Sequence, residues 1–538
     1  MTSLFEIPTV LYVYGLLLLL ISYFVLPYLF DSCHLRRKCI DGPKSAAFSN
    51  LWLAYVAARG NRSESVHRLH QKYGKFVRIA PNHISIADHR AIEPIYGHGS
   101  GTFKSDFYDA FVSIRASLFT TRDRAAHARK RKVVSSVLSQ QNVLQFEPLI
   151  RKHVRLLLAQ WDLKCAKGQE KNGRAWFNVP PQFNFLTFDI TGDLTFGASF
   201  GMIEAQRDIA PMLQLSESNT SLVTYIPAIK VLNDRGNFSA SMGVLAPWVR
   251  KWVLLFPWFR SGSAAVESLA GMANAAVDKR LREGAPEDED DFDEEVGRVK
   301  RVDLLEKLMD GKDEFGEPLG REELTAEALT LMIAATDTTS NSSSAITYYL
   351  AAHPGIQQKL QAELDGAFGS SDSTDLWSSV AKYSNIKSLP YLQACIQEGM
   401  RMHSALGAGL PRVIPKGVNV EVCGETFTEG TVLSVPSYSI HHNSEVWGDD
   451  SEEFKPERWL DKKGAGKEFV PFSFGPRACV GRNLANLMII IIIASIFHRY
   501  DVTLQYEGQK PVIREGLLRK PIQCVLGIKK RRGNSPEA

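Results

Sequence analysis

The sequence predicts a mainly α-helical protein with a small β portion, preceded by a single N-terminal transmembrane helix. Three observations support this prediction. An uncharged apolar stretch lies near the start of the chain, helical periodicity dominates from Arg122 onward, and only short runs of β-type residues interrupt it. No Pro-, Gly- or Ser-rich linker divides the part that follows the first stretch, so we expect one large domain there.

The segment 7–30 contains no charged residue and is long enough to cross a bilayer core, which requires about 20 apolar residues in a helix. It lacks the basic start and the small-residue cleavage site of a signal peptide. Basic residues follow at 36–38, and the positive-inside tendency therefore places the rest of the chain in the cytoplasm. We predict a transmembrane anchor at 7–30, a linker at 31–45 and a catalytic domain at 46–538. The alternative for 7–30 is a buried core helix.

The expected helices and strands follow from periodicity and turn residues. Helices are expected at 122–138, 146–161, 183–196, 263–282 and 321–352. Strands are expected at 76–79 and 83–87, paired around a turn, then at 418–422 and 431–435, and again between 500 and 527. The apolar run 487–497 is about half the length that a membrane span needs, so we expect a helix buried on all sides.

Composition excludes several classes of protein. The net charge of +4 is too small to indicate nucleic-acid binding. The seven cysteines are odd in number and widely scattered, which argues against a disulfide framework, and no CxxC pair suggests zinc. A reducing, cytosol-facing compartment fits this cysteine usage best.

The strongest motif is a turn-rich loop that leads into the run 487–497. Gly475 and Gly481 permit close backbone approach and positive φ. Cys479 stands where the helix begins, so free amide N–H groups can lower the pKa of its thiol. Alone, it could equally be a free core cysteine. The loop, however, resembles the cytochrome P450 haem loop FxxGxRxCxG at every fixed position: Phe472, Gly475, Arg477, Cys479 and Gly481.

This resemblance implies the cytochrome P450 fold and a haem b (iron protoporphyrin IX) cofactor, with Cys479 as the axial ligand of the iron. A thiolate bound to haem iron pushes electron density towards bound oxygen and favours O–O cleavage. Arg477 is then placed to meet a haem propionate. Phe472, Gly475 and Gly481 complete the cofactor-binding loop.

Two further segments resemble family motifs. Glu398 and Arg401 match ExxR, and residues at i and i+3 share a helix face. The segment 456–459 resembles the PERF or PERW element, so Arg458 is expected to join them in a buried network that is structural in role. Without the resemblance, the alternative is an exposed helical ion pair.

Other basic residues resemble the family's propionate ligands. His127 and Arg131 lie four residues apart in an expected helix, and Arg412 follows the ExxR segment. Arginine suits this role because it makes charge-assisted hydrogen bonds to carboxylates. Further basic residues at 124, 129, 130 and 132 leave it open which side chains of this helix take the role. The alternative for each arginine is a surface charge.

The expected helix 321–352 contains a segment that resembles the P450 distal-helix signature [AG]Gx[DE]T[TS]. Thr338 is expected to stabilise oxygen bound over the iron, and Asp337 to deliver protons from solvent. The family's usual glycine is replaced by Ala335, whose methyl group narrows the space above the haem and so tunes the substrate pocket. The alternative is a set of polar side chains satisfied within a helix.

The segments 103–111, 121–124, 410–415 and 434–436 resemble the benzoate 4-monooxygenase group of fungal P450s. This implies 4-hydroxylation of benzoate with O2, using NADPH through NADPH–cytochrome P450 reductase, with cytochrome b5 as a further candidate partner. The segment 73–82 resembles fungal microsomal P450s, which implies that the protein lies in the endoplasmic reticulum membrane. A small aromatic acid needs a buried donor for its carboxylate. Arg115 is the candidate, and its alternative is a solvent-facing loop charge.

Three rival functions remain open. The first is a tailoring P450 of fungal secondary metabolism. The second is a non-catalytic haem-binding or electron-transfer protein, and the third is a haem-thiolate isomerase or dehydratase. The Asp337–Thr338 pair argues against the last two, because neither needs a proton relay.

Overall fold

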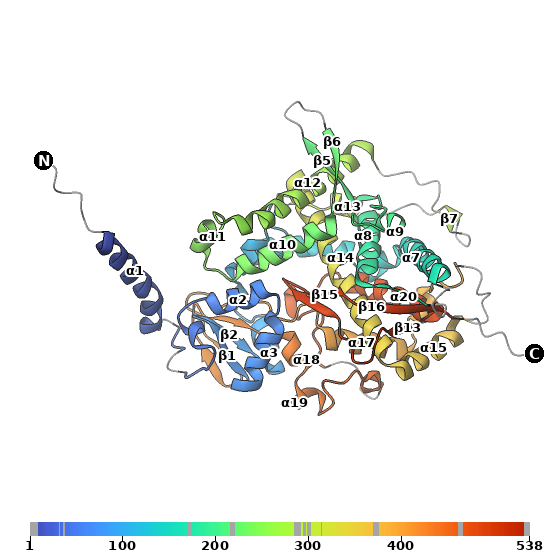
Figure 1. The fold of residues 1–538 in the computed structure, drawn as a ribbon. Helices are drawn as coiled ribbons and strands as arrows, with labels where there is room; N and C mark the ends of the chain where they lie inside the picture. Colours follow the sequence, from blue (N-terminus) through green and yellow to red (C-terminus); the bar gives the residue numbers. More distant parts are fainter. Residues whose placement is uncertain are drawn as a thin grey trace, which may run out of the picture.

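The computed structural model describes residues 9–31, 33–35, 38–168, 174–215, 221–284, 292–293, 297–298, 303–313, 315–368, 376–460 and 466–531. Helix α14 (Arg321–Ala352) runs through the middle of the molecule, and α8, α12, α17 and α20 pack against it (Figure 1). The other long helices surround this centre: α7 (Glu147–Lys167), α8 (Pro180–Phe196), α10 (Ala228–Gly243), α12 (Arg260–Glu283), α15 (Pro354–Phe368), α17 (Pro390–His403) and α20 (Arg482–Arg499).

Shorter helices connect and flank the long ones. They are α2 (Leu51–Arg59), α3 (Arg62–Tyr73), α4 (Ile92–Tyr96), α5 (Arg124–Val137), α6 (Gln140–Leu144), α9 (Met202–Ala205), α11 (Pro247–Val253), α13 (Leu304–Met309), α16 (Tyr383–Ile386), α18 (Ser437–His441) and α19 (Ser444–Trp447).

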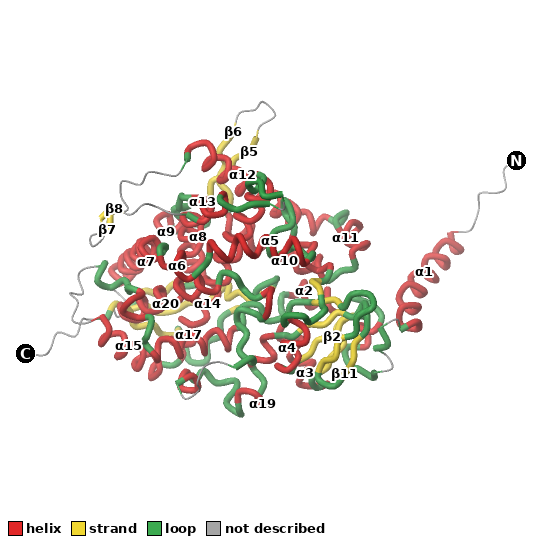
Figure 2. Tube along the Cα trace, turned by 180° about the vertical axis from the view of Figure 1, so that it is seen from behind, coloured by secondary structure: helices red, strands yellow, loops and turns green. Residues whose placement is uncertain are grey.

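The strands form several small sheets among and around the helices (Figure 2). The largest sheet has the order β1 (Phe76–Ala80), β2 (His83–Ile86), β12 (Val432–Ser434), β9 (Arg412–Val413) and β3 (Phe103–Lys104). A second sheet joins β13 (Tyr500–Leu504), β16 (Val525–Lys530) and β4 (Ala175–Asn178). The two-stranded pairs are β10 (Val420–Val422) with β11 (Glu425–Phe427), β14 (Val512–Glu515) with β15 (Arg519–Gln523), β5 (Ala210–Leu215) with β6 (Ser221–Ile226), and β7 (Phe292–Asp293) with β8 (Gly297–Arg298).

These elements confirm the predicted mainly helical architecture with a small β portion. The expected helix 321–352 has the bounds of α14, and the expected hairpin is the antiparallel pair β1–β2. Sequence patterns did not predict which distant strands pair. The expected strands near 420 and 433, for instance, belong to different sheets, because β12 pairs with β2 and β9 whereas β10 pairs with β11.

Helix α20 contains the isoleucine-rich run. Its length and composition would suit a membrane crossing, yet 72% of it is buried inside the fold. Ile491, Ile492 and Ile493 are completely buried. A helix that is apolar on every side belongs in the core of a large domain, and these burials confirm that prediction.

Helix α1 (Thr9–Phe30) projects away from the rest of the molecule (Figure 1). Its exposed apolar side chains include Leu18 at 69% and Leu19 at 68%. Residues 7 and 8 of the predicted anchor, and Arg36 and Arg37 after it, lie outside the described residues.

Part of the predicted linker 31–45 packs on the catalytic domain instead of running free. Cys33 and Leu35 are buried in a cluster with Ile84, Ile86 and side chains from β10 and β11. Lys38 also forms an ion pair of 2.7 Å with Glu425. These contacts tie the described part of residues 33–38 to the body of the molecule.

The contrast between α1 and α20 gives a direct test. Ile492→Asn places an amide in the packed core, and we expect its thermal unfolding midpoint in detergent to fall by several degrees, since a buried unsatisfied polar group costs roughly 2 kcal/mol or more. Leu18→Asn is the matched control, because Leu18 is exposed. An equal loss of stability in both variants would contradict the assignment of α20 to the core.

Candidate active site

A cavity of about 320 Å³ lies between α14 and the loop that precedes α20. Ala334, Ala335 and Thr338 line it from α14. Phe472, Arg477, Cys479 and Gly481 line it from the loop, with further walls from α10, from 403–410 and from 516–520. Residues that the sequence places far apart therefore face one internal space.

The loop has the tight backbone that its glycines predict, with one difference. Gly475 has a φ of +73°, and a Cβ there would collide with the carbonyl oxygen of Tyr96, so only glycine fits. Gly481 has a φ of −85°, and a Cβ there would make an ordinary contact of 3.9 Å with the Cys479 sulfur. The expected positive φ at Gly481 was therefore wrong.

Cys479 lies just ahead of α20, and its backbone N–H donates to the Phe472 carbonyl at 2.8 Å. Its side chain is exposed to the cavity while protein surrounds it on the other sides. Burial raises the pKa of the Cys479 thiol, because it outweighs the hydrogen bond from the Gly481 N–H and the attraction of Arg131 and Arg482. The loop alone therefore does not lower the thiol pKa, contrary to the expectation from the sequence. A coordinated metal cation deprotonates a thiol directly.

The contacts of helix α5 show which of its clustered basic side chains face α14 and which face the cysteine loop. Lys130 binds Glu323 at 2.5 Å and Glu327 at 3.0 Å on α14. Arg129 also pairs with Glu323, at 2.7 Å. Arg131, in contrast, donates to the carbonyl of Ala478, the residue before Cys479. The helix thus divides its bases between α14 and the cysteine loop.

The cysteine loop is surrounded by like charges. Arg477 donates to the carbonyls of Thr121 and Arg122 at 2.7 and 3.1 Å. Burial and repulsion from Arg412 lower the pKa of Arg477 to about 10. Burial, followed by Arg477, Lys104, Arg131 and Arg412, lowers the pKa of His127 to about 3.

Arg412 is 3% exposed, and in the described part of the chain its side chain forms no hydrogen bond or ion pair, only a cation–π contact of 5.4 Å with Tyr96. Lys104 is also buried, and sequence reasoning missed it because one lysine on a two-residue strand gives no signal. Several mutually repelling cations, none of which forms an ion pair within the residues that the structure describes, suit an anionic group. The propionates and iron of a haem fit this donor set and the free sulfur.

On the other wall, the Thr338 hydroxyl donates to the Ala334 carbonyl at 2.7 Å, one turn earlier in α14. A hydroxyl that donates in this way keeps its lone pairs as acceptors. Asp337 is buried, and Lys520 of β15 donates to its carboxylate at 2.6 Å. Sequence analysis missed Lys520, because 183 positions separate the pair. Ala335 lines the cavity as predicted for a pocket residue.

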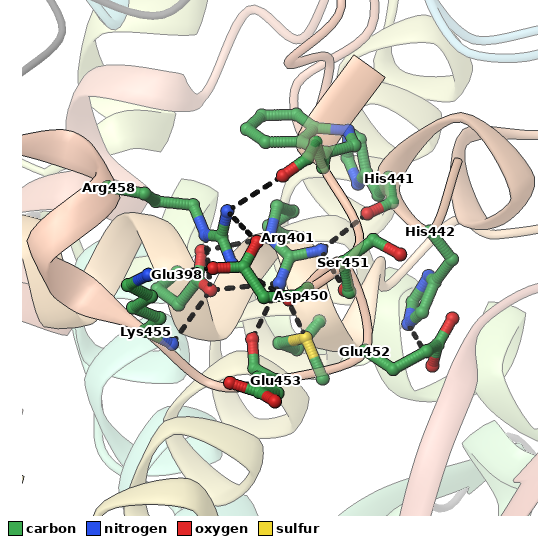
Figure 3. Close-up of polar contacts among 12 residues, drawn as sticks. Glu398, Arg401, His441, His442, Asp450, Ser451, Glu452, Glu453, Lys455 and Arg458 are labelled. Atoms are coloured by element: carbon green, nitrogen blue, oxygen red, sulfur yellow. Dashed lines mark hydrogen bonds and ion pairs between the residues drawn. The ribbon is translucent and has the colours of Figure 1, made fainter. Parts of the chain in front are cut away.

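Glu398, Arg401 and Arg458 form one network of polar contacts (Figure 3). Arg401 makes two hydrogen bonds of 2.8 Å to Glu398, and Arg458 makes one of 2.9 Å. Both Glu398 and Arg401 are completely buried. Trp459 adds a hydrogen bond of 2.9 Å to the same carboxylate, a partner that the sequence motif did not indicate.

Arg115 does not reach the cavity. Its side chain is 51% exposed and lies 3.8 Å from Glu323, which also binds two bases of α5. The loop holding Arg115 turns it towards solvent and α14. The structure therefore gives no support to Arg115 as a substrate ligand.

A cavity-facing cysteine ahead of a buried helix, a cationic cluster beside it and an acid–alcohol pair opposite define a haem-thiolate protein. The chain belongs to the cytochrome P450 family, whose family model matches residues 42–527, and it is a monooxygenase of that family. It is 46% identical over 526 residues to benzoate 4-monooxygenase bphA of Aspergillus niger, covering 96% of this chain and 97% of that protein.

More distant relatives carry other names. The chain is 30% identical to cytochrome P450 monooxygenase gsfF of Penicillium aethiopicum, covering 86% of this chain and 88% of the relative. It is 28% identical to pisatin demethylase of Fusarium vanettenii, covering 90% and 89% of the two chains.

The Glu398 network should be needed for stability. Glu398→Gln removes the carboxylate that pairs with the buried Arg401 and leaves Arg458 with Asp450 alone. Breaking such a buried network costs roughly 3–5 kcal/mol. We expect lower haem content and a clearly lower thermal unfolding midpoint. Glu457→Gln is the matched control, because Glu457 is partly exposed and pairs with Lys359 outside the network. Equal behaviour of the two variants would contradict a bracing role for Glu398.

Proposed function

We propose that this P450 hydroxylates benzoate at C4. The observation that carries the proposal is the 46% identity to a benzoate 4-monooxygenase over nearly the full length of both chains. The relatives with other names lie near 30% identity. This difference favours a small aromatic acid over the larger metabolites of a tailoring enzyme.

In this proposal Cys479 holds the haem iron, and Arg477, His127, Arg131 and Arg412 face the propionates. Phe472, Gly475 and Gly481 shape the loop around the sulfur. Thiolate-ligated haem supplies the activation of O2 that lets one oxygen atom enter the substrate. The protein contributes the ligand, the proton path and the pocket, and these are the parts that the contacts support.

Asp337 and Thr338 carry the proton path. Thr338 offers its lone pairs to the cavity, because its hydrogen is held by Ala334. Asp337 faces Lys520, which also binds Asn233 of α10. To pass a proton towards Thr338, the Asp337 carboxylate has to leave Lys520 by side-chain rotation. The ion pair with Lys520 therefore sets the resting position of this relay.

Electrons come from NADPH through NADPH–cytochrome P450 reductase in this proposal, with cytochrome b5 as an additional donor. In this proposal the chain is a single-pass protein of the endoplasmic reticulum membrane, with α1 as its anchor and the catalytic domain, residues 46–538, facing the cytoplasm. Exposed apolar side chains support the proposal that one side of the molecule faces the membrane. Besides α1, Trp248 and Trp252 on α11 are 54% and 65% exposed, and α11 lies on the same side of the molecule as α1 (Figures 1 and 2).

The axial-ligand assignment is tested by Cys479→Ala. We expect the reduced, CO-bound variant to lose the red-shifted Soret band that a thiolate ligand gives, and to lose monooxygenase activity. Cys395→Ala is the matched control, since Cys395 is buried in the core away from the cavity lining. A normal band in Cys479→Ala would exclude Cys479 as the ligand.

The substrate assignment is tested with the full-length holoenzyme reconstituted with the reductase. We expect benzoate to shift the Soret band and NADPH-dependent turnover to give 4-hydroxybenzoate. If the protein shows the thiolate band with CO but neither a benzoate-induced shift nor a hydroxylated product, the benzoate proposal is wrong and the P450 assignment stands.

A further inference from the structure

A buried arginine enters the cavity from α10, an element that neither the haem loop nor the distal-helix motif includes. Arg235 is 9% exposed and lines the cavity. Its Nη2 donates to the Phe111 carbonyl at 2.7 Å, and its Nε donates to the Ser113 hydroxyl at 3.1 Å. These hydrogen bonds fix the guanidinium plane. Within the described residues, Nη1 has no hydrogen-bond partner.

The charges on the cavity wall do not balance. Three arginine and lysine side chains line it, those of Arg235, Arg477 and Lys520, and Asp337 is its one carboxylate among the residues that the structure describes. Lys520 already binds Asp337 at 2.6 Å. Arg477 belongs to the cationic cluster around the cysteine loop. One positive charge, that of Arg235, is therefore left over.

Burial makes this excess charge costly. It lowers the pKa of Arg235 to about 10, although Asp337 attracts the guanidinium from a distance. Arg235 therefore stays charged at neutral pH while it is poorly solvated. A buried cation of this kind is stabilised by an anionic ligand that binds beside it in the cavity. Arginine suits a carboxylate especially well, because its planar group donates in a fixed fork.

We propose that Arg235 binds the carboxylate of an aromatic acid substrate and so selects and orients it. This inference rests on the proposed function and adds the residue that recognises the acid. The cavity suits the rest of such a ligand, because Leu232, Ile333 and Leu517 also line it and offer apolar contacts to a ring. Arg235 and Cys479 enter the cavity from separate elements. If the carboxylate binds Arg235, the ring carbon opposite it points away from Arg235.

Arg235 takes the role that sequence analysis gave to Arg115. A buried carboxylate still needs a hydrogen-bond donor. Arg115, the residue predicted for this role, faces Glu323 instead. The donor comes instead from a helix more than a hundred positions further along the chain.

The test compares a carboxylate with its neutral isostere. Benzoate and benzamide are titrated into the full-length holoenzyme and into Arg235→Gln, with the Soret shift as the readout. We expect benzoate to bind the variant more weakly by roughly 30-fold or more, since removing one partner of a buried charge pair has at least that effect. Benzamide affinity should change by no more than about threefold, because it carries no charge for Arg235 to bind.

Two further variants separate charge recognition from structure. Lys230→Gln removes the same charge from the same helix, but Lys230 is 68% exposed and pairs with Asp234, so benzoate binding should stay at the wild-type level. Arg235→Lys keeps the charge with a different geometry and should be intermediate. In turnover, Arg235→Gln should raise the KM for benzoate more than it lowers kcat.

The outcomes are distinguishable. Equal loss of benzoate and benzamide binding in Arg235→Gln, or unchanged benzoate binding, would overturn the role of Arg235. If the glutamine variant yields no thiolate band with CO, Arg235→Lys replaces it in the same comparison. If wild-type enzyme neither binds nor hydroxylates benzoate, the proposed function fails, and Arg235 is tested with other aromatic acids against their amides. Wild-type preference for none of these acids over its amide would then overturn the Arg235 proposal as well.

Discussion

The buried carboxylate of Glu398 holds together the elements on which the cysteine loop rests. Arg401 binds this carboxylate and also donates to the carbonyls of His441 and Ser451, at 2.6 and 2.7 Å. The ring of His441 then accepts a hydrogen bond of 3.1 Å from the backbone N–H of Val470. Val470 stands at the start of the segment that leads to Cys479. A continuous path of hydrogen bonds therefore runs from α17 to the loop.

The protonation state of His441 makes this path work. Burial, together with the charge of Arg401, lowers the pKa of His441 to about 3, so the ring is neutral at physiological pH. Because Val470 N–H can only donate, Nε2 must accept, and the hydrogen on Nδ1 is free to donate to the Ser404 hydroxyl at 2.6 Å. Arg401, which binds Glu398, thus also helps to keep His441 in the neutral form that the loop requires.

The parts of the site that could be predicted are those that short stretches of sequence encode. The cysteine loop, the ExxR pair and the acid–alcohol pair are local patterns, because turn geometry and helix periodicity fix their residues relative to one another. The structure places all of them around one cavity or beneath it. The partners that come from elsewhere could not be predicted. Lys520 reaches Asp337 from β15, and Trp459 reaches Glu398 across 61 positions of the chain. In neither case does spacing along the chain indicate the contact.

Substrate recognition belongs to this second group for a physical reason. The chemistry of oxygen activation needs a ligand, an acid and an alcohol at nearly fixed positions, so short motifs can encode them. A pocket only has to present one complementary charge and apolar walls, and any element that borders the cavity can supply them. In this protein α10 supplies Arg235, while Asn233, two residues earlier on the same helix, binds the lysine that holds Asp337. Helix α10 therefore carries the proposed substrate anchor, Arg235, and contacts the proton relay through Asn233. A shift of α10 on substrate binding would move both residues together.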